Sequence, residues 1–120
     1  MPHALRLETT PDRSFTGALP VNTGFSLARL MVLERGWSAS QFSCLRSLWQ
    51  RESGWNPYAA NPYSGAYGIP QALPGSKMQS AGADWQTNPA TQIKWGLGYI
   101  QGRYGSPCSA WSYWQAHNWY

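Results

Sequence analysis

The sequence predicts an α+β domain that is predominantly α-helical, with several short helices around one core. Two observations carry this prediction. Apolar residues recur at helical spacing in several segments that begin at capping residues and end at glycines. One stretch, residues 56–75, is instead rich in Pro and Gly, which predicts a loop or a small hairpin inserted after the second helix. The length of 120 residues leaves room for one compact domain.

The chain starts with a segment that has no hydrophobic period. Residues 1–23 mix Pro and Thr with scattered polar residues, so we expect an irregular N-terminal arm ahead of a domain that covers residues 24–120. The first helix is predicted over residues 25–36, because apolar side chains recur there at helical spacing and Gly36 supplies a stop.

The second helix has the clearest start. Ser38 and Gln41 have the spacing of a capping box, and Trp37 with Phe42 can form the hydrophobic staple that accompanies such a box. Gly54 predicts the end of this helix.

Three further helices are expected after the loop. A brief one is capped by Ser76, and a longer one runs from its cap, Asn88, to Gly105. Ser106 caps the terminal helix, which begins at Pro107.

The longer of these helices contains two glycines. Gly96 and Gly98 both lower its helix propensity, which indicates that another group packs close to the backbone there. The apolar stripe that we expect this helix to bury consists of Ile93, Leu97, Ile100 and Tyr104.

Aromatic residues make up 15% of the chain, with 8 Trp, 7 Tyr and 3 Phe. A core of this size cannot enclose so many rings, so we expect several to line a groove, where flat amphipathic rings suit sugar faces or nucleobases. The tryptophans that we expect in the core instead are Trp49, Trp95 and Trp111.

The net charge of +4 favours an anionic partner, which could be an acidic cell-wall polymer, a membrane surface or a nucleic acid. The basic residues are scattered and form no run, which disfavours a dedicated nucleic-acid arm. No apolar run reaches about 18 residues, so no membrane span is expected. The N-terminus lacks the continuous apolar core of an export signal.

The chain has two cysteines, Cys44 and Cys108, and they permit one pairing. A disulfide between them closes a long loop and stabilises the chain by roughly 4 kcal/mol in the chain-entropy model. The alternative is two reduced, buried thiols. Neither cysteine has the spacing of a metal ligand, so we expect no metal site, and no motif calls for a cofactor.

Glu52 is the residue with the strongest chemical signal. At 100° per residue it lies between Leu48 and Trp49 on the apolar stripe of the second helix. A carboxyl group there loses hydration, so its pKa should rise and it can serve as a general acid for a glycosidic oxygen. The alternative is a structural ion pair with an arginine, for which the candidates are Arg46, Arg51 and Arg103.

A second catalytic carboxylate is poorly supplied. Glu8 and Asp12 lie in the N-terminal arm and Glu34 ends another helix, which leaves Asp84 as the one candidate partner. A single-carboxylate mechanism needs no partner, because the acid can first protonate the leaving oxygen and then deprotonate a nucleophile that the substrate carries. Serine–histidine catalysis is disfavoured, since His117 lies close to the C-terminus and no nucleophile elbow is present.

Four ordered motifs give the chain a resemblance. "ESGWNP", "SGAYGIPQ", "NPATQIKWGLGYI" and "AWSYWQAHNWY" occur in the order and spacing of the lytic transglycosylase (SLT-like) domain related to goose-type lysozyme. The chain resembles most its actinobacterial branch, a neighbour of the resuscitation-promoting factors. The resemblance covers residues 25–120 and implies a lysozyme-like fold.

The resemblance also implies a set of site residues. Glu52 would be the catalytic acid and base, and the substrate-binding residues would be Ser64, Gly65, Ala66, Tyr67, Gln71, Tyr99 and Trp114. The chain departs from the family in two places. Pro70 stands where the family has Met, and Trp114 with Gln115 stands where it has Tyr-Asn, so the missing hydroxyl would come from Tyr99 or Tyr113.

The activity that the resemblance implies is cleavage of the β-1,4 bond between N-acetylmuramic acid and N-acetylglucosamine in peptidoglycan, with a 1,6-anhydro product. We expect a monomer that acts on glycan strands and is secreted or associated with the cell wall, its export signal being absent from this chain. The alternatives are a hydrolytic muramidase, a non-catalytic peptidoglycan-binding module and, as a weaker reading, a basic nucleic-acid binder.

Overall fold

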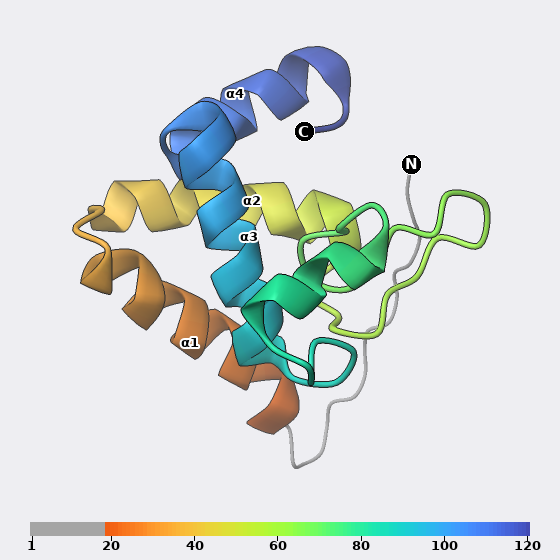
Figure 1. Ribbon diagram of the computed structural model, residues 1–120. Coiled ribbons are helices and arrows are strands. Elements are labelled where there is room, and N and C mark those ends of the chain that lie inside the picture. The colour runs from red at the N-terminus through yellow and green to blue at the C-terminus, as the bar shows by residue number, and fades with distance from the viewer. Residues whose placement is uncertain (1–18) are drawn as a thin grey trace.

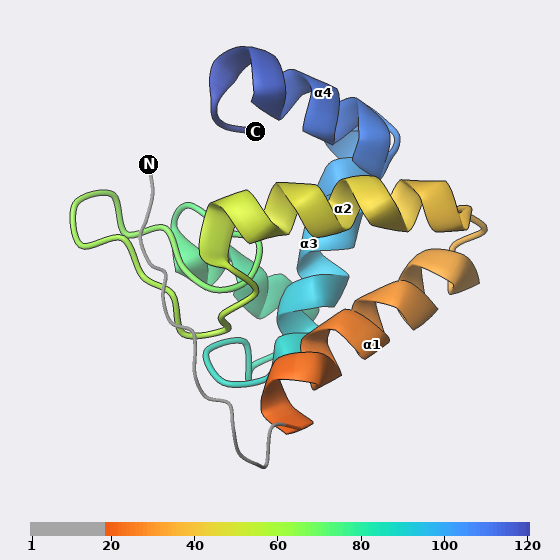
Figure 2. The ribbon, with the colours of Figure 1, turned by 180° about the vertical axis from the view of Figure 1, so that it is seen from behind.

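The structure, a computed structural model, describes residues 19–120 as a helical domain. Its elements are α1 (Leu19–Glu34), α2 (Ala39–Ser53), the 3₁₀ helix η2 (Gly75–Ala81), α3 (Pro89–Tyr104) and α4 (Pro107–His117). α3 runs through the middle of the domain, where it packs against α1, η2 and α4 (Figure 1). α2 lies behind α3 in the view of Figure 1 and in front of it in Figure 2, and it packs against α1 and α4. No helix in the described part of the chain is both long and apolar enough to cross a membrane.

Most helix ends lie where local sequence chemistry predicts them. Gly54 ends α2 in the left-handed conformation, with φ of 61°. The side chain of Asn88 accepts the backbone N–H of Ala90 at the start of α3, at 2.9 Å. Ser106 caps α4 in the same way, through the N–H of Ser109. These predicted boundaries are confirmed.

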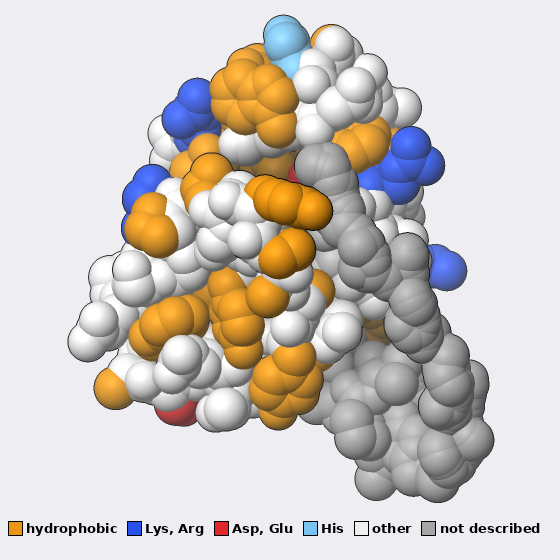
Figure 3. Space-filling model, turned by 90° about the vertical axis from the view of Figure 1, so that its right-hand side faces the viewer, with side chains coloured by type: hydrophobic (Ala, Val, Ile, Leu, Met, Phe, Trp, Pro, Cys, Tyr) orange, Lys and Arg blue, Asp and Glu red, His pale blue; other side chains and the backbone are white. Residues whose placement is uncertain are grey.

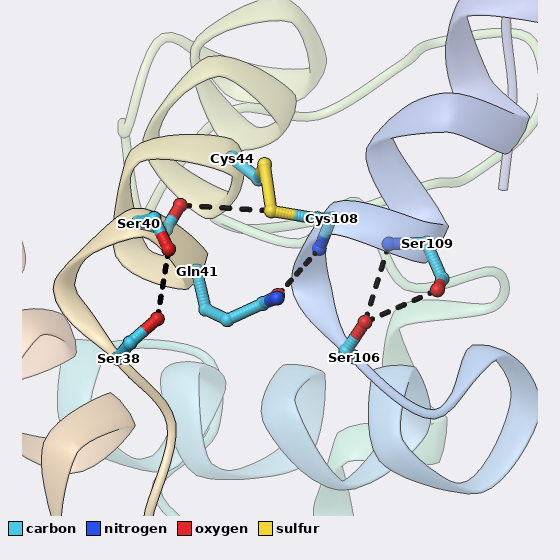
Figure 4. The surroundings of a disulfide bond; sticks show 7 residues. All are labelled: Ser38, Ser40, Gln41, Cys44, Ser106, Cys108 and Ser109. Carbon is cyan, nitrogen blue, oxygen red and sulfur yellow. Dashed lines mark hydrogen bonds between the residues drawn. A yellow bond between two sulfur atoms is a disulfide. The ribbon is translucent and has the colours of Figure 1, made fainter.

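The predicted capping box at the start of α2 is wrong. Ser38 precedes the helix, but its hydroxyl pairs with that of Ser40 at 2.8 Å and makes no capping bond. The side-chain oxygen of Gln41 instead accepts the backbone N–H of Cys108, in the first turn of α4, at 2.8 Å (Figure 4). The N–H groups of a helix's first turn have no partner within their own helix, so the neighbouring helix uses Gln41.

Two other boundaries differ from the prediction. α1 begins at Leu19, so residues 19–23 of the predicted irregular arm are helical; Pro20 falls in the first turn, where proline is tolerated. The brief helix begins at Gly75, with Pro74 as its preceding residue, so Ser76 is not its cap. The rest of the predicted arm lies outside the described residues, and the division of the chain at residue 24 stays a prediction.

The segment between α2 and η2 is an ordered loop. Its only β-pairing consists of two isolated antiparallel bridges, Ala60 with Tyr67 and Tyr67 with Ala72. No longer strand forms anywhere in residues 19–120. Of the two predicted alternatives, a loop or a small hairpin, the structure therefore has a loop, which returns the chain to the end of α2.

The core joins α1, α2, α3 and the start of α4 through buried apolar side chains. The ring of Trp49 lies on the backbone of α3 at Gly96, where an added Cβ would come within 2.5 Å of Trp49 Cζ2. The predicted close approach is thus confirmed at Gly96, whereas nothing lies near Gly98. The buried cluster comprises Ala28, Val32, Leu45, Leu48, Trp49, Trp55, Ile69, Ile93, Leu97, Ile100 and Ala110.

A disulfide between Cys44 and Cys108 links α2 to α4, with a Cα–Cα distance of 4.9 Å (Figure 4). The predicted pairing is confirmed. The Cys108 sulfur also lies 3.5 Å from the carbonyl oxygen of Ser40, but a bridged sulfur has no hydrogen to donate, so this is a packing contact. The bridge and the Gln41 bond together fix the start of α4 on α2.

Candidate active site

A cleft with a volume of about 350 Å³ opens where the end of α2, the loop, α3, α4 and the C-terminal residues meet. Figure 3 looks onto the side of the molecule that carries the loop, and shows hydrophobic side chains gathered over it with Lys and Arg toward the edges. The lining residues are Arg51, Glu52, Asn61, Ser64, Ala66, Pro70, Gln71, Ala72, Leu73, Lys77, Trp95, Tyr99, Trp114, Asn118, Trp119 and Tyr120.

Glu52 lies in the last turn of α2, half-buried in this cleft. Its Oε2 atom accepts a hydrogen bond of 2.6 Å from the indole Nε1–H of Trp114. Burial raises the pKa of the Glu52 carboxyl to about 7, although the Trp114 hydrogen bond acts in the opposite direction. The group is therefore present in both protonation states near neutral pH, as a residue that both gives and takes a proton requires.

The predicted alternative, an ion pair between Glu52 and an arginine, is not what the described residues form. Arg46 lies over the ring of Phe25, with its Cζ atom 5.6 Å from the ring centroid. Arg51 lies over Trp114 at 5.1 Å, and Arg103 over Tyr104 at 5.7 Å. No arginine contributes to the pKa shift of Glu52.

Trp114 is held in place from two sides. Its ring stacks on that of Trp111, with centroids 5.5 Å apart and planes 20° from parallel. The Arg51 guanidinium lies over it, a cation–π arrangement. The family resemblance predicts Trp114 at the site, but only as a substrate-binding residue, and nothing in the sequence indicates that its indole would donate to Glu52.

The floor of the cleft is built around Tyr120, which the sequence analysis missed. Its hydroxyl accepts a hydrogen bond from Trp49 Nε1 at 2.7 Å and donates one to the carbonyl oxygen of Pro70 at 2.9 Å. Burial and the nearby Glu52 raise the pKa of Tyr120 well above its usual value, so this hydroxyl stays protonated. The motif "AWSYWQAHNWY" ends at this residue, but the resemblance assigned no role to it, and no helical period extends this far.

Tyr99, on α3, lines the cleft as predicted. Its hydroxyl donates to the backbone oxygen of Tyr120 at 2.8 Å, and its ring stacks on Trp95 with centroids 5.2 Å apart. Trp95 is half-buried and lines the cleft too, so its predicted place in the core is wrong. Tyr113, the other candidate for the missing hydroxyl, is not a lining residue; its ring stacks on His117 at 4.0 Å.

The loop contributes Ser64, Ala66 and Gln71 to the cleft. Gln71 has a positive φ of 57°, and its side-chain nitrogen donates to the carbonyl oxygens of Ala59 and Gly68. These two bonds fix the side chain within the loop. The left-handed backbone conformation explains why its position could not be derived from any regular period.

Two other predicted loop residues are not among those that line the cleft. Tyr67 packs edge-on against Trp85, with centroids 5.6 Å apart, and its hydroxyl donates to the carbonyl oxygen of Gln86 at 2.7 Å. Gly65 lies at an exposed turn with φ of 84°. The structure therefore brings Glu52 together with five of the seven predicted binding residues, and leaves these two outside.

Asp84 is not a second carboxylate of the cleft. Its two oxygens accept hydrogen bonds from Thr91 Oγ1 at 2.6 Å and from Asn88 Nδ2 at 2.8 Å, at the start of α3. These bonds hold the pKa of Asp84 below its usual value. Among the lining residues, all of which belong to the described part of the chain, Glu52 is the single acidic side chain.

The cleft thus offers one carboxyl group with a near-neutral pKa, several aromatic rings and two cations, Arg51 and Lys77. Across residues 19–120, no group of three or more His, Cys, Asp or Glu side chains is placed to hold a metal ion. A site of this composition can deliver and recover a proton at a sugar whose faces rest on the rings.

The segment that contains this site matches a known protein family. No curated protein and no solved structure gives a significant match to the chain. A family model does: the model described as "Transglycosylase SLT domain" matches residues 37–119, a span that runs from the start of α2 to the residues beyond α4 and includes Glu52. The chain therefore belongs to the transglycosylase SLT domain family, whose members are lytic transglycosylases and lysozyme-like glycosidases that act on peptidoglycan.

Proposed function

We propose that this enzyme cleaves the β-1,4 bond between N-acetylmuramic acid and N-acetylglucosamine, with Glu52 as the single acid and base. The observation that carries the proposal is the half-buried Glu52, whose carboxyl pKa is raised by burial to about 7, in an aromatic cleft lined by no second acidic side chain. Two-carboxylate glycosidases need a partner group within about 10 Å to act as a nucleophile or base. With one carboxyl, the nucleophile has to be activated by the same residue that protonated the leaving group.

The proposed reaction proceeds in two proton transfers. Protonated Glu52 gives its proton to the glycosidic oxygen, the C1–O bond breaks, and positive charge develops at C1 of the muramic sugar. The 6-hydroxyl of the same sugar then attacks C1, and the Glu52 carboxylate takes the hydroxyl proton. The glycan is released with a 1,6-anhydro end, and Glu52 is again protonated.

The rest of the cleft is proposed to hold the glycan. The rings of Trp95, Tyr99 and Trp119 line the cleft, and aromatic rings pack on the apolar sides of sugars. Arg51 and Lys77 place positive charge beside the one acidic lining residue, which suits an anionic cell-wall polymer. We also propose that the protein acts outside the cytoplasm, since a structural disulfide persists in oxidising compartments. That it acts as a monomer stays a prediction.

The test is a turbidity assay on purified cell walls with wild-type protein and with Glu52→Gln, which keeps the size of the side chain and an oxygen for Trp114. We expect lysis by the wild type and a loss of at least about a thousandfold in the variant. Glu34→Gln, at the exposed end of α1, is the matched control and should retain full activity. Lysis by a folded Glu52→Gln variant would refute the proposal.

Mass spectrometry of the released fragments then identifies the nucleophile. A 1,6-anhydro end is one water lighter than a reducing end, so the two products are distinguished by mass. An anhydro product supports attack by the sugar hydroxyl, whereas a reducing end identifies a hydrolytic muramidase. Sedimentation of the protein with cell walls and no released fragments would identify a non-catalytic binding module.

A further inference from the structure

We propose that Trp114 is a positioning residue that fixes the proton of Glu52 on Oε1 by keeping Oε2 as a hydrogen-bond acceptor. The proposal rests on the function proposed above. At this position the chain departs from the family to which it is similar, because Trp114 and Gln115 stand where the family has Tyr-Asn. The proposal gives Trp114 a role other than contact with substrate.

The indole of Trp114 determines which oxygen of Glu52 can carry the proton. The Nε1–H group of Trp114 donates to Glu52 Oε2 at 2.6 Å, and an indole nitrogen can only donate. The oxygen that accepts this bond cannot also present a proton toward it. When Glu52 is protonated, the proton therefore lies on Oε1, which has no hydrogen-bond partner among the described residues and is free to meet a substrate. A tyrosine hydroxyl at this position could donate or accept, so it would not make the same distinction.

The packing around the Trp114 ring restricts its rotation away from Glu52. Trp111 stacks on one side of the Trp114 ring, at 5.5 Å, and the Arg51 guanidinium lies over it at 5.1 Å. A ring held in this way keeps its N–H direction while the protonation state of Glu52 changes. The helix that carries both tryptophans, α4, is tied at its start to α2 by the disulfide.

The hydrogen bond from Trp114 to Glu52 becomes stronger during the reaction. When Glu52 transfers its proton, Oε2 gains negative charge and the Trp114 bond becomes charge-assisted, which makes it roughly twice as strong. The interaction is therefore stronger in the transition state than in the ground state, which is the condition for an effect on rate. Its loss should lower kcat and kcat/KM together, by about tenfold.

Other charged or titratable side chains line the cleft around Glu52 and can affect the pKa of its carboxyl. Arg51 on α2, Lys77 on η2, Tyr99 on α3 and Tyr120 near the C-terminus all line the same cleft. Burial keeps the hydroxyl of Tyr120 protonated. Glu52 is the lining group whose pKa lies near neutral pH, and Trp114 is its hydrogen-bond donor.

The test replaces Trp114 by 3-benzothienylalanine, which keeps the bicyclic ring and substitutes sulfur for the N–H group. We expect kcat and kcat/KM for cell-wall lysis to fall about tenfold. The alkaline limb of the pH profile should move upward by about one unit, because a bond that favours ionised Glu52 has been removed. The same replacement at Trp37, outside the cleft, is the matched control and should change neither quantity. An unchanged rate and profile in the Trp114 variant would overturn the proposal.

A second measurement needs no activity. The Nε1–H resonance of Trp114 in ¹⁵N-labelled protein, assigned by its absence in the 114 variant, should shift with a midpoint near pH 7, and Glu52→Gln should abolish that shift. If the wild type releases no wall fragments but this titration is seen, the proposed activity is refuted. The inference that Trp114 fixes the position of the Glu52 proton is then still supported. A resonance that does not respond to Glu52 would overturn the inference whether or not the walls are cleaved.

Discussion

The side-chain oxygen of Gln92 accepts the backbone N–H of Ile69 at 2.9 Å, deep in the domain. The side-chain nitrogen of the same residue donates to the carbonyl oxygens of Pro57 and Trp85, each at 2.9 Å. One buried amide on α3 therefore satisfies three backbone groups from the segments on either side of η2, and it fixes the loop that carries part of the cleft. It lies against Gly68, where an added Cβ would come within 2.7 Å of Gln92 Oε1.

Replacement of this residue by leucine should be strongly destabilising. Gln92→Leu leaves three buried backbone groups without partners, and each costs about 1–3 kcal/mol, so we expect a loss of about 3 kcal/mol or more in the free energy of unfolding. Urea denaturation monitored by tryptophan fluorescence measures it. Gln115→Leu, at an exposed position on α4, is the control and should change stability by less than about 0.5 kcal/mol. Equal effects of the two substitutions would contradict this role for Gln92.

Glu52 should reduce the stability of the protein as the pH rises. Its pKa is raised from an ordinary value of 4.5 to about 7 in the folded state, so between these values the folded state binds more protons than the unfolded state. The contribution of Glu52 to stability is therefore greatest below about pH 4.5 and is lost as the pH rises through about 7, a total change of about 3 kcal/mol.

Glu52→Gln removes this titration. We expect the variant to be more stable than the wild type by up to about 3 kcal/mol at pH 8 and to differ little from it at pH 4. Urea denaturation of both proteins at the two pH values measures the difference. Glu34→Gln should show no such pH dependence. A stability difference that is the same at pH 4 and pH 8 would show that the carboxyl is not desolvated in the folded protein.

The disulfide should contribute substantially to stability. Cys44 and Cys108 are separated by 64 residues, and closure of a loop of this length is worth about 4 kcal/mol in the chain-entropy model. We expect Cys44→Ser combined with Cys108→Ser to lose up to that amount, and reductant to destabilise the wild type but not the double variant. Two free thiols in denatured, unreduced wild-type protein would contradict the bridge.

Trp95 should contribute to glycan binding and not only to packing. Its half-buried ring lines the cleft and stacks on Tyr99, so Trp95→Ala removes one of the surfaces proposed to hold a sugar. We expect KM for cell walls to rise about fivefold, with a smaller change in kcat, from the loss of about 1 kcal/mol of ring contact. Tyr63→Ala provides the comparison, because that ring is 97% exposed at the tip of the loop and does not line the cleft. An equal rise in KM for both variants would refute a specific role for Trp95.

Much of the fold could be predicted because its signals are local. The ends of α2, α3 and α4 follow from Gly54, Asn88 and Ser106, each of which bonds or bends the backbone next to it. Gly96 predicted a close approach on α3, and the ring of Trp49 is found there. The prediction failed where a distant group offered another hydrogen bond. Gln41 accepts the backbone N–H of Cys108 at the start of α4, and so does not cap its own helix.

For the site, the sequence by itself determined that Glu52 lies on an apolar helix stripe and that Cys44 can pair only with Cys108, because helical periodicity and a count of two cysteines suffice for both. The tertiary structure decided which group meets that carboxyl. Trp114 lies 62 residues away and reaches Glu52 only because α4 packs on α2. Hydrogen bonds between distant residues depend on how helices pack, and no periodicity along the chain encodes that arrangement.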